Sequence, residues 1–371
     1  MHTTLPRQFY ADAEFYRREL ERFYFTRWIC AGRADQIPNA GDYFTRTIAD
    51  ESIIVTRDEH GHIHALFNVC RHRGTRLCER DEGHLPLRIQ CPYHSWTYDL
   101  QGRLLAAPFM PPDFSREQYP LHRAGCEIWG GHIFVFLGSS LPTLPAPPAL
   151  PALPALRDQL ADLPKRFARY RMQDLRLGRR IVYDVKANWK LIVLNYNECL
   201  HCPNLHPTLN KLHHYLGADN VAPTPEYCGG AMGFKDGVET LSTDGKRRRE
   251  FLPGLRGRDR EVVNYFAIYP NFLLTLHPDY MMTITIWPRD CGRTTLVAEW
   301  HFHPDEMKKK DFVCADAIDF WDRTNREDWA ISEQSYLGIS SRGYQPGPYS
   351  ERERQLWEFD QFVLARVNQS P

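Results

Sequence analysis

The sequence predicts an α+β protein of two domains: a small antiparallel β domain, then a larger domain with an antiparallel sheet and flanking helices. Short alternating apolar runs with turns between them fill residues 42–137, and strand-like runs followed by one long helical stretch fill residues 157–371. Six prolines within residues 139–155 mark a stiff connector between the two regions. A chain of 371 residues is long enough for two domains that each bury a core.

The N-terminal part, residues 1–38, is predicted to be a helical segment that packs on the larger domain. Apolar side chains recur at helical spacing from Phe9 to Phe23, so we expect one amphipathic helix over residues 9–28. The β domain then occupies residues 39–138. Its clearest hairpin joins strand-like runs at 52–56 and 64–67.

The proline-rich linker is placed at residues 139–156 and the larger domain at 157–371. In the larger domain the expected elements are several strands and two helices, a pattern that favours helices packed against an antiparallel sheet. The expected strands are 181–185, 272–276, 281–287 and 294–302, and the expected helices are 189–202 and 311–337.

Composition excludes several classes of partner. Lysine plus arginine (46) equals aspartate plus glutamate (46), so the chain has neither a basic footprint for nucleic acid nor a polybasic membrane anchor. No apolar run approaches the length of a membrane span, and the first residues lack an apolar signal core, so we expect a cytoplasmic protein. In that reducing compartment its ten cysteines are expected to be thiols or metal ligands.

Two short runs each pair one cysteine with one histidine, in the same order: Cys70 with His72, and Cys91 with His94. A zinc finger groups its cysteines and its histidines separately. In a Rieske [2Fe-2S] centre two cysteines hold one iron and two histidines hold the other, so two loops of this kind fit that site. Either run alone is weak evidence, but the pair is a strong indication of a Rieske cluster.

A second constellation contains Glu198, His201 and His206. On the expected helix 189–202, Glu198 and His201 share a face, and the prolines that follow break the helix, so His206 comes off the bend. Two histidines and one carboxylate are the ligands of oxygen-activating non-haem iron(II). The carboxylate is either Glu198 or Asp328, which lies on an inward-facing stripe of the C-terminal helix, where an acid is costly unless paired or metal-bound.

Cys199 and Cys202 form a Cys-x-x-Cys pair within the same run. Such a pair also occurs in redox dithiols and zinc sites, but the β-rich setting argues against the thioredoxin type. We expect both to be small buried residues, and a structural role for the neighbouring His213.

With both constellations in view, the chain resembles the α subunit of Rieske-type non-haem iron oxygenases, the ring-hydroxylating oxygenase superfamily. The likeness runs from the paired Cys/His loops through the Glu198–His206 segment to residues 324–329 and 338–350. It implies a larger domain of the helix-grip type and a homotrimer in which the cluster of one subunit faces the iron of its neighbour. The site residues that it implies are Cys70 and Cys91 on one cluster iron, His72 and His94 on the other, and His201, His206 and Asp328 on the mononuclear iron.

The acid matching Glu198 bridges the two centres in this family, which gives it a catalytic role. Glutamate beside Cys199 is more similar to the branch that acts on choline, glycine betaine and carnitine than to the ring dioxygenases. The resemblance therefore implies hydroxylation or oxidative N-demethylation of a small substrate such as a quaternary ammonium compound. A dioxygenase or monooxygenase of an aromatic acid is the alternative, and an electron carrier that uses the cluster alone leaves residues 157–371 unexplained.

The electron source is expected to be a separate protein. The chain contains no G-x-G-x-x-G run and hence no visible nicotinamide or flavin site, so we expect an NAD(P)H-dependent flavin/iron–sulfur reductase as partner. For a cationic substrate an aromatic box is expected, for which Tyr265, Phe266, Tyr269, Tyr280 and Trp287 are candidates.

Overall fold

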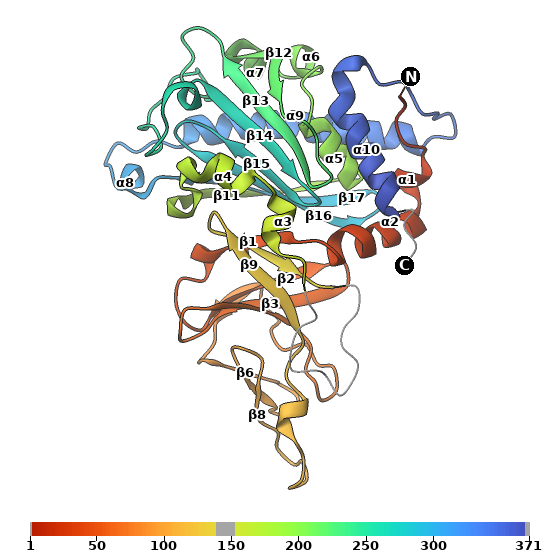
Figure 1. Ribbon diagram of the computed structural model, residues 1–371, viewed down its shortest axis with the longest axis vertical. Helices are drawn as coiled ribbons and strands as arrows, with labels where there is room; N and C mark the ends of the chain where they lie inside the picture. Colours follow the sequence, from red (N-terminus) through yellow and green to blue (C-terminus); the bar gives the residue numbers. More distant parts are fainter. Residues whose placement is uncertain (1, 139–152, 368–371) are drawn as a thin grey trace. The chain divides into compact units, whose positions relative to one another are not determined.

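The computed structural model describes residues 2–138 and 153–367 (Figure 1). Contacts divide the chain into two units, Tyr24–Gln159 and Met1–Phe23 with Leu160–Pro371. Most of the expected proline-rich linker, residues 139–152, lies outside the described residues. Both units are built on antiparallel sheets, and helices pack on the sheet of the second unit, which confirms the predicted α+β class.

The unit Tyr24–Gln159 contains a seven-stranded sheet and a three-stranded sheet. In the larger sheet the strand order is β1 (Ile29–Arg33), β10 (His132–Phe136), β9 (Arg123–Trp129), β4 (Ile63–Phe67), β3 (Glu51–Arg57), β2 (Asp42–Ile48) and β5 (Glu82–His84). The smaller sheet contains β6 (Arg88–Gln90), β7 (Thr97–Asp99) and β8 (Leu104–Ala106). Strands β3 and β4 pair antiparallel, which confirms the hairpin expected from the alternating pattern.

The larger unit is built on one antiparallel sheet of seven strands. Its order is β11 (Arg176–Val185), β17 (Arg293–Phe302), β16 (Met281–Asp290), β15 (Phe272–Leu276), β14 (Val262–Ile268), β13 (Tyr227–Phe234) and β12 (His213–Asn220). Four of these strands, β11, β15, β16 and β17, contain the runs that the sequence predicted. The residues of β15 and most of those of β16 are buried without a break, whereas buried residues alternate along much of β17.

Helices cover this sheet, with the long α9 (Ala315–Ser340) running behind it in Figure 1. Helix α9 packs against β11 and α5 (Trp189–Tyr196), and α10 (Arg354–Val367) packs against β13 and α2 (Ala13–Glu19). The shorter α-helices are α1 (Gln8–Ala11), α3 (Leu156–Leu160), α4 (Leu163–Phe167), α6 (Cys202–Leu205), α7 (Pro207–Leu212) and α8 (Pro304–Met307). In the described residues every helix is too short or too polar to cross a bilayer.

The single helix predicted over residues 9–28 is wrong. Asp12 is extended and its side chain accepts hydrogen bonds from the backbone N–H groups of Glu14 and Phe15, so it ends α1 and caps α2. A π-helical turn, Leu20–Phe25, follows α2. Apolar spacing therefore identified the helical region but not the break that a capping aspartate introduces.

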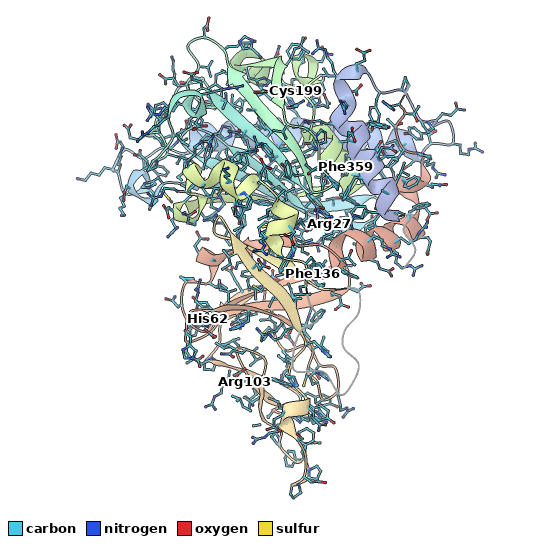
Figure 2. All side chains as sticks on the ribbon, in the orientation of Figure 1. Arg27, His62, Arg103, Phe136, Cys199 and Phe359 are labelled. Carbon is cyan, nitrogen blue, oxygen red and sulfur yellow. A yellow bond between two sulfur atoms is a disulfide. The ribbon has the colours of Figure 1, made fainter. Side chains whose placement is uncertain are left out.

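Buried contacts hold α2 against α5 within the larger unit. Lys190 Nζ donates to Glu19 Oε1 at 2.6 Å and Trp189 Nε1 donates to Glu19 Oε2 at 3.0 Å, with both members of the ion pair fully buried. Edge-on aromatic contacts of Trp189 with Phe23 and Phe359, the latter labelled in Figure 2, extend this cluster. Contacts with Glu19, Phe23 and Phe359 thus fix the start of α5, which leads into the second constellation.

Candidate functional site

The two Cys/His loops have the same backbone conformation. The N–H of Cys70 donates to the carbonyl of Thr75 at 2.8 Å, and the N–H of Cys91 donates to the carbonyl of Trp96 at 2.8 Å. The fifth residue of each loop has a positive φ, +75° at Gly74 and +59° at Ser95, and a serine adopts that region only when its surroundings impose it. Both turns therefore hold their cysteines in equivalent positions, and the histidine follows two residues later in one loop (His72) and three residues later in the other (His94).

The four side chains of these loops converge. Both cysteines are 2% exposed, burial and the neighbouring Cys91 raise the pKa of the Cys70 thiol, and the rings of His72 and His94 lie 4.7 Å apart. The Nδ1 atoms of His72 and His94 are buried and have no hydrogen-bond partner among the described residues. Buried polar atoms are almost always paired, so two orphaned imidazole nitrogens beside two buried thiols fit a Rieske cluster.

The second constellation brings His201, His206 and Asp328 together. Their ligand atoms all lie within 4.8 Å of one another, and Asp328 Oδ1 lies 2.8 Å from His206 Nε2 and 3.4 Å from His201 Nε2. The third residue comes from α9, more than 120 positions along the chain from the two histidines. This His₂-carboxylate set fits the ligands of non-haem iron(II).

Glu198 contacts His201 of this ligand set from a non-helical segment and not from the helix that was expected. Helix α5 ends at Tyr196, so the helix predicted over 189–202 is wrong, and Glu198 and His201 lie on a turn. Glu198 Oε1 nevertheless accepts a short hydrogen bond from His201 Nδ1, so the predicted contact exists although its helical explanation was wrong. Pro203 and Pro207 lie in the first turns of the short helices α6 and α7 instead of breaking a longer helix.

The carboxylates set the electrostatics of the cluster. Burial by itself lowers the pKa of His201, but hydrogen bonds with Asp328 and Glu198 outweigh it and raise the pKa to about 9. The same contacts hold the pKa of Asp328 below its ordinary value although burial opposes them. Carboxylates that stabilise a cationic imidazole also stabilise a metal cation, so the electrostatics agree with the donor set.

One contact of this cluster was not assigned from the sequence. Glu327, the neighbour of Asp328 on α9, lies 2.7 Å from His206 Nδ1 through its Oε2. Asp322, another acid of α9, accepts a hydrogen bond from Tyr183 Oη at 2.7 Å and pairs with Arg326. The two adjacent acids thus contact opposite nitrogens of one imidazole, an arrangement that i, i+1 spacing on a helix does not reveal.

A cavity of about 470 Å³ adjoins the cluster and is lined by all three of its residues. Four aromatic side chains, Tyr196, Tyr215, Tyr265 and Trp321, line it as well. Of the aromatic residues proposed from the sequence, only Tyr265 lines this cavity. The others, Phe266, Tyr269, Tyr280 and Trp287, are buried elsewhere in the larger unit.

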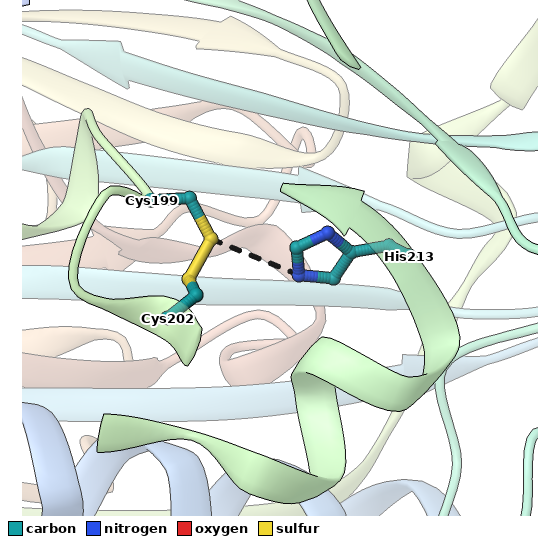
Figure 3. Close-up of side chains that lie close together, drawn as sticks. All are labelled: Cys199, Cys202 and His213. Carbon is teal, nitrogen blue, oxygen red and sulfur yellow. Dashed lines mark hydrogen bonds between the residues drawn. A yellow bond between two sulfur atoms is a disulfide. The ribbon is translucent and has the colours of Figure 1, made fainter. Parts of the chain in front are cut away.

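The expectation for Cys199 and Cys202 was correct about burial and wrong about bonding. Both are buried, but they form a disulfide across the turn that contains His201 (Figure 3). His213, at the start of β12, places Nε2 3.7 Å from the Cys199 sulfur. Burial, with Lys235 nearby, lowers the pKa of His213 to about 4. The remaining eight cysteines form no disulfide.

The fold and the two ligand sets define an oxidoreductase with an iron–sulfur domain and a mononuclear iron domain. Residues 27–128 match the Rieske [2Fe-2S] domain family, and residues 172–369 match the ring hydroxylating alpha subunit (catalytic domain) family. The chain belongs to the Rieske-type ring-hydroxylating oxygenase family. Its cofactors are a Rieske [2Fe-2S] cluster and a mononuclear iron, and proteins of this kind draw electrons from a reductase.

Similar proteins include the glycine betaine monooxygenase oxygenase subunit of Chromohalobacter salexigens, 32% identical over 94% of this chain and 82% of that protein. The carnitine monooxygenase oxygenase subunit of Escherichia coli (strain K12) is 34% identical over 92% of this chain and 85% of that protein. The fold is similar to that of the quaternary ammonium Rieske monooxygenase CntA in complex with L-carnitine, with a TM-score of 0.79, 24% identity, and 99% and 96% of the two chains covered. Naphthalene 1,2-dioxygenase from Rhodococcus sp. shares the fold with a TM-score of 0.76, 19% identity, and 100% and 95% covered.

Proposed function

We propose that this protein is the oxygenase component that uses O2 and reductase electrons to hydroxylate or N-demethylate a small quaternary ammonium compound of the betaine type. The observation that carries the proposal is that Tyr196, Tyr265 and Trp321 line the same cavity as the His₂-carboxylate cluster. Aromatic faces bind quaternary ammonium groups through cation–π attraction. The glycine betaine, carnitine and choline monooxygenases among the relatives support the same substrate class.

Three of the aromatic side chains, Tyr196, Tyr265 and Trp321, form a connected wall. The ring of Tyr265 lies edge-on to that of Tyr196 at 6.2 Å and to that of Trp321 at 6.4 Å. The hydroxyl of Tyr196 lies 2.8 Å from that of Thr275, and Trp321 Nε1 donates to Tyr280 Oη at 2.8 Å, so the polar ends of both are held by the fold. A methylated ammonium group therefore meets rings whose positions are already fixed, which lowers the entropic cost of binding.

The cavity also offers partners for an anionic end of the substrate. Arg352 and Arg354, at the start of the C-terminal helix region, line it together with Gln355. Arginine pairs with carboxylates in a charge-assisted and frequently bidentate manner. A cavity with an aromatic wall and guanidinium groups suits a zwitterion that carries both a quaternary ammonium group and a carboxylate.

We assign the metal ligands from the same geometry. The cluster irons are held by Cys70 and Cys91 on one side and by His72 and His94 on the other, and the mononuclear iron by His201, His206 and Asp328. When bound, the cluster supplies single electrons and the mononuclear iron activates O2 beside the substrate. The protein orients the imidazoles through Glu198 and Glu327 and excludes water with the aromatic wall.

Glu198 is proposed to carry the electron path. It would bridge His94 of one subunit and His201 of the next in a homotrimer, which requires its carboxylate to accept hydrogen bonds from both rings. The contact with His201 is present within one chain, and inter-subunit electron transfer is described for a solved quaternary ammonium Rieske monooxygenase of the same fold. We keep a trimeric assembly and a cytoplasmic location as parts of this proposal.

The proposed domain limits are 1–38 for the N-terminal segment, 39–138 for the Rieske domain, 139–156 for the linker and 157–371 for the catalytic domain. The family matches at 27–128 and 172–369 support two functional domains in that order.

Product analysis tests the substrate. The purified protein, a surrogate reductase and NADH are incubated with glycine betaine, carnitine, choline and a set of aromatic acids. We expect O2-dependent demethylation with one formaldehyde per demethylated product. Hydroxylated aromatic acids, with the betaines untouched, would favour the alternative, in which the same rings line an apolar pocket and an arginine pairs the acid.

A binding comparison separates the two explanations of the aromatic wall. Glycine betaine and its isostere 3,3-dimethylbutyrate have the same shape and the same carboxylate, but the isostere has a neutral tert-butyl group in place of the trimethylammonium group, so an apolar pocket binds the isostere at least as well. Cation–π attraction of about 0.5–2 kcal/mol predicts preference for the cation, and that preference should decrease in Tyr265→Leu. Equal affinities for the two ligands would contradict the cationic assignment.

A further inference from the structure

Cys199, Cys202 and His213 form a second buried cluster of metal-ligating side chains in the catalytic unit (Figure 3). They come from the turn after α5, the first residue of α6 and the first residue of β12. Each residue offers one ligand atom, and these atoms all lie within 4.8 Å of one another. This cluster shares no residue with the set of His201, His206 and Asp328.

The geometry of the cluster fits a thiophilic cation. In a tetrahedral zinc site, bonds of about 2.3 Å to sulfur and 2.0–2.1 Å to nitrogen place these two atoms about 3.6 Å apart. His213 Nε2 lies 3.7 Å from Cys199 Sγ. The Cys-x-x-Cys spacing of the two sulfurs is also typical of zinc sites.

The imidazole of His213 lacks the partners that a buried ring normally has. The side chain is fully buried, its Nδ1 has no hydrogen-bond partner among the described residues, and its Nε2 lies 3.7 Å from the sulfur of Cys199. Buried polar nitrogens are rarely left in this state without an unseen water or ion. A cation bound to Nε2 gives this nitrogen a strong partner.

Charge also favours a divalent cation once the disulfide is reduced. Two thiolates and a neutral imidazole balance a charge of +2, so the filled site buries no net charge. The three residues also line the cavity, which leaves the fourth tetrahedral position to a water molecule. Two sulfurs and one imidazole with an open position is a known zinc coordination.

We propose that the reduced pair Cys199 and Cys202, together with His213, binds Zn²⁺ in the wall of the cavity, and that the disulfide is the metal-free form of this site. A dithiol reductant opens the disulfide: two electrons and two protons convert it to two thiols while the reductant becomes a disulfide. Zinc then displaces the two thiol protons as the zinc–sulfur bonds form. In a reducing compartment the thiol form, and hence the site, is available.

Zinc binding by the holoenzyme tests this proposal. The iron-loaded protein is reduced anaerobically with a phosphine, incubated with Zn²⁺ and freed of excess metal, and its zinc and iron contents are measured. Zinc K-edge X-ray absorption then reports the ligands of zinc alone, without interference from the iron cluster. We expect one zinc per chain with two sulfurs at about 2.3 Å, unchanged iron and cluster absorption, and loss of this zinc after reoxidation.

Variants test whether the sulfur ligands of the zinc come from Cys199 and Cys202. Cys199→Ser with Cys202→Ser should lose the sulfur-bound zinc, whereas Cys314→Ser, a half-buried free thiol of the same unit, should retain it. Zinc bound only through nitrogen and oxygen, or zinc that replaces iron one for one, would show that it enters the mononuclear site and would overturn the proposal. The absorption spectrum of the unaltered protein decides this even if the double variant fails to fold.

Discussion

Removing the negative charge of Glu327, which contacts His206, should weaken the binding of the mononuclear iron without disturbing the iron–sulfur cluster. Glu327 Oε2 lies 2.7 Å from His206 Nδ1, so the carboxylate fixes the ring and increases the basicity of Nε2 on its far side. In Glu327→Gln the amide oxygen still accepts the hydrogen bond, but the charge is lost. In Glu327→Ala both are lost.

The size of the effect follows from the burial of the pair. Loss of an outer partner of a metal-bound histidine typically costs about 10- to 100-fold in metal affinity or activity. His206 is 1% exposed, but Glu327 is 31% exposed, so water partly screens its charge. We therefore expect about 10-fold weaker iron binding in Glu327→Gln and about 100-fold in Glu327→Ala, or about 1.4 and 2.7 kcal/mol.

Iron affinity is measured directly. A chelator removes the mononuclear iron anaerobically, and equilibrium dialysis against Fe(II) gives the dissociation constant while the visible absorption of the cluster confirms its integrity. Glu333→Gln is the matched control, because Glu333 lies on the same helix but its carboxylate accepts a hydrogen bond from the N–H of Lys186. Iron affinities equal to the wild type in both Glu327 variants would refute the reasoning.

Three further outcomes are expected. Asp328→Ala should abolish turnover and iron binding while the cluster spectrum persists, whereas Asp322→Ala should keep its iron; the reverse result would reassign the third ligand. Glu198→Gln should retain both metals, yet reoxidation of the reduced cluster by O2 with substrate present should slow at least about 10-fold, and an unchanged rate would remove Glu198 from the electron path. Burial raises the pKa of the Asp360 carboxyl to about 7, whereas the value in an unfolded chain is about 3.9. The folded chain therefore binds this proton more tightly than the unfolded chain, and the free energy of unfolding decreases as pH rises from about 4 to 7. The loss between pH 5 and pH 8 is about 2–3 kcal/mol, and Asp360→Asn, which has no such proton, should show a smaller fall in melting temperature; an equal fall would contradict this assignment.

The sequence by itself determined the class of protein and most strands. Ligand pairs such as Cys70 with His72 lie within one loop, so their spacing in the chain already reflects the geometry that a metal requires. Strands such as β15 and β16 were predictable because buried β-branched and aromatic side chains mark them locally. The helix at 311–337 was predicted four residues too early, since α9 begins at Ala315.

Only the tertiary structure decided how the catalytic centre is assembled. Packing of α9 brings its acids close to histidines more than 120 positions earlier in the chain. Asp328 therefore lies between His201 and His206, and Glu327 contacts the other nitrogen of His206. Helix α5 also ends at Tyr196, and in the segment that follows the Glu198 carboxylate accepts a hydrogen bond from the N–H of Leu200. Helical propensity is a weak local preference, and contacts that become available only in the folded chain override it there.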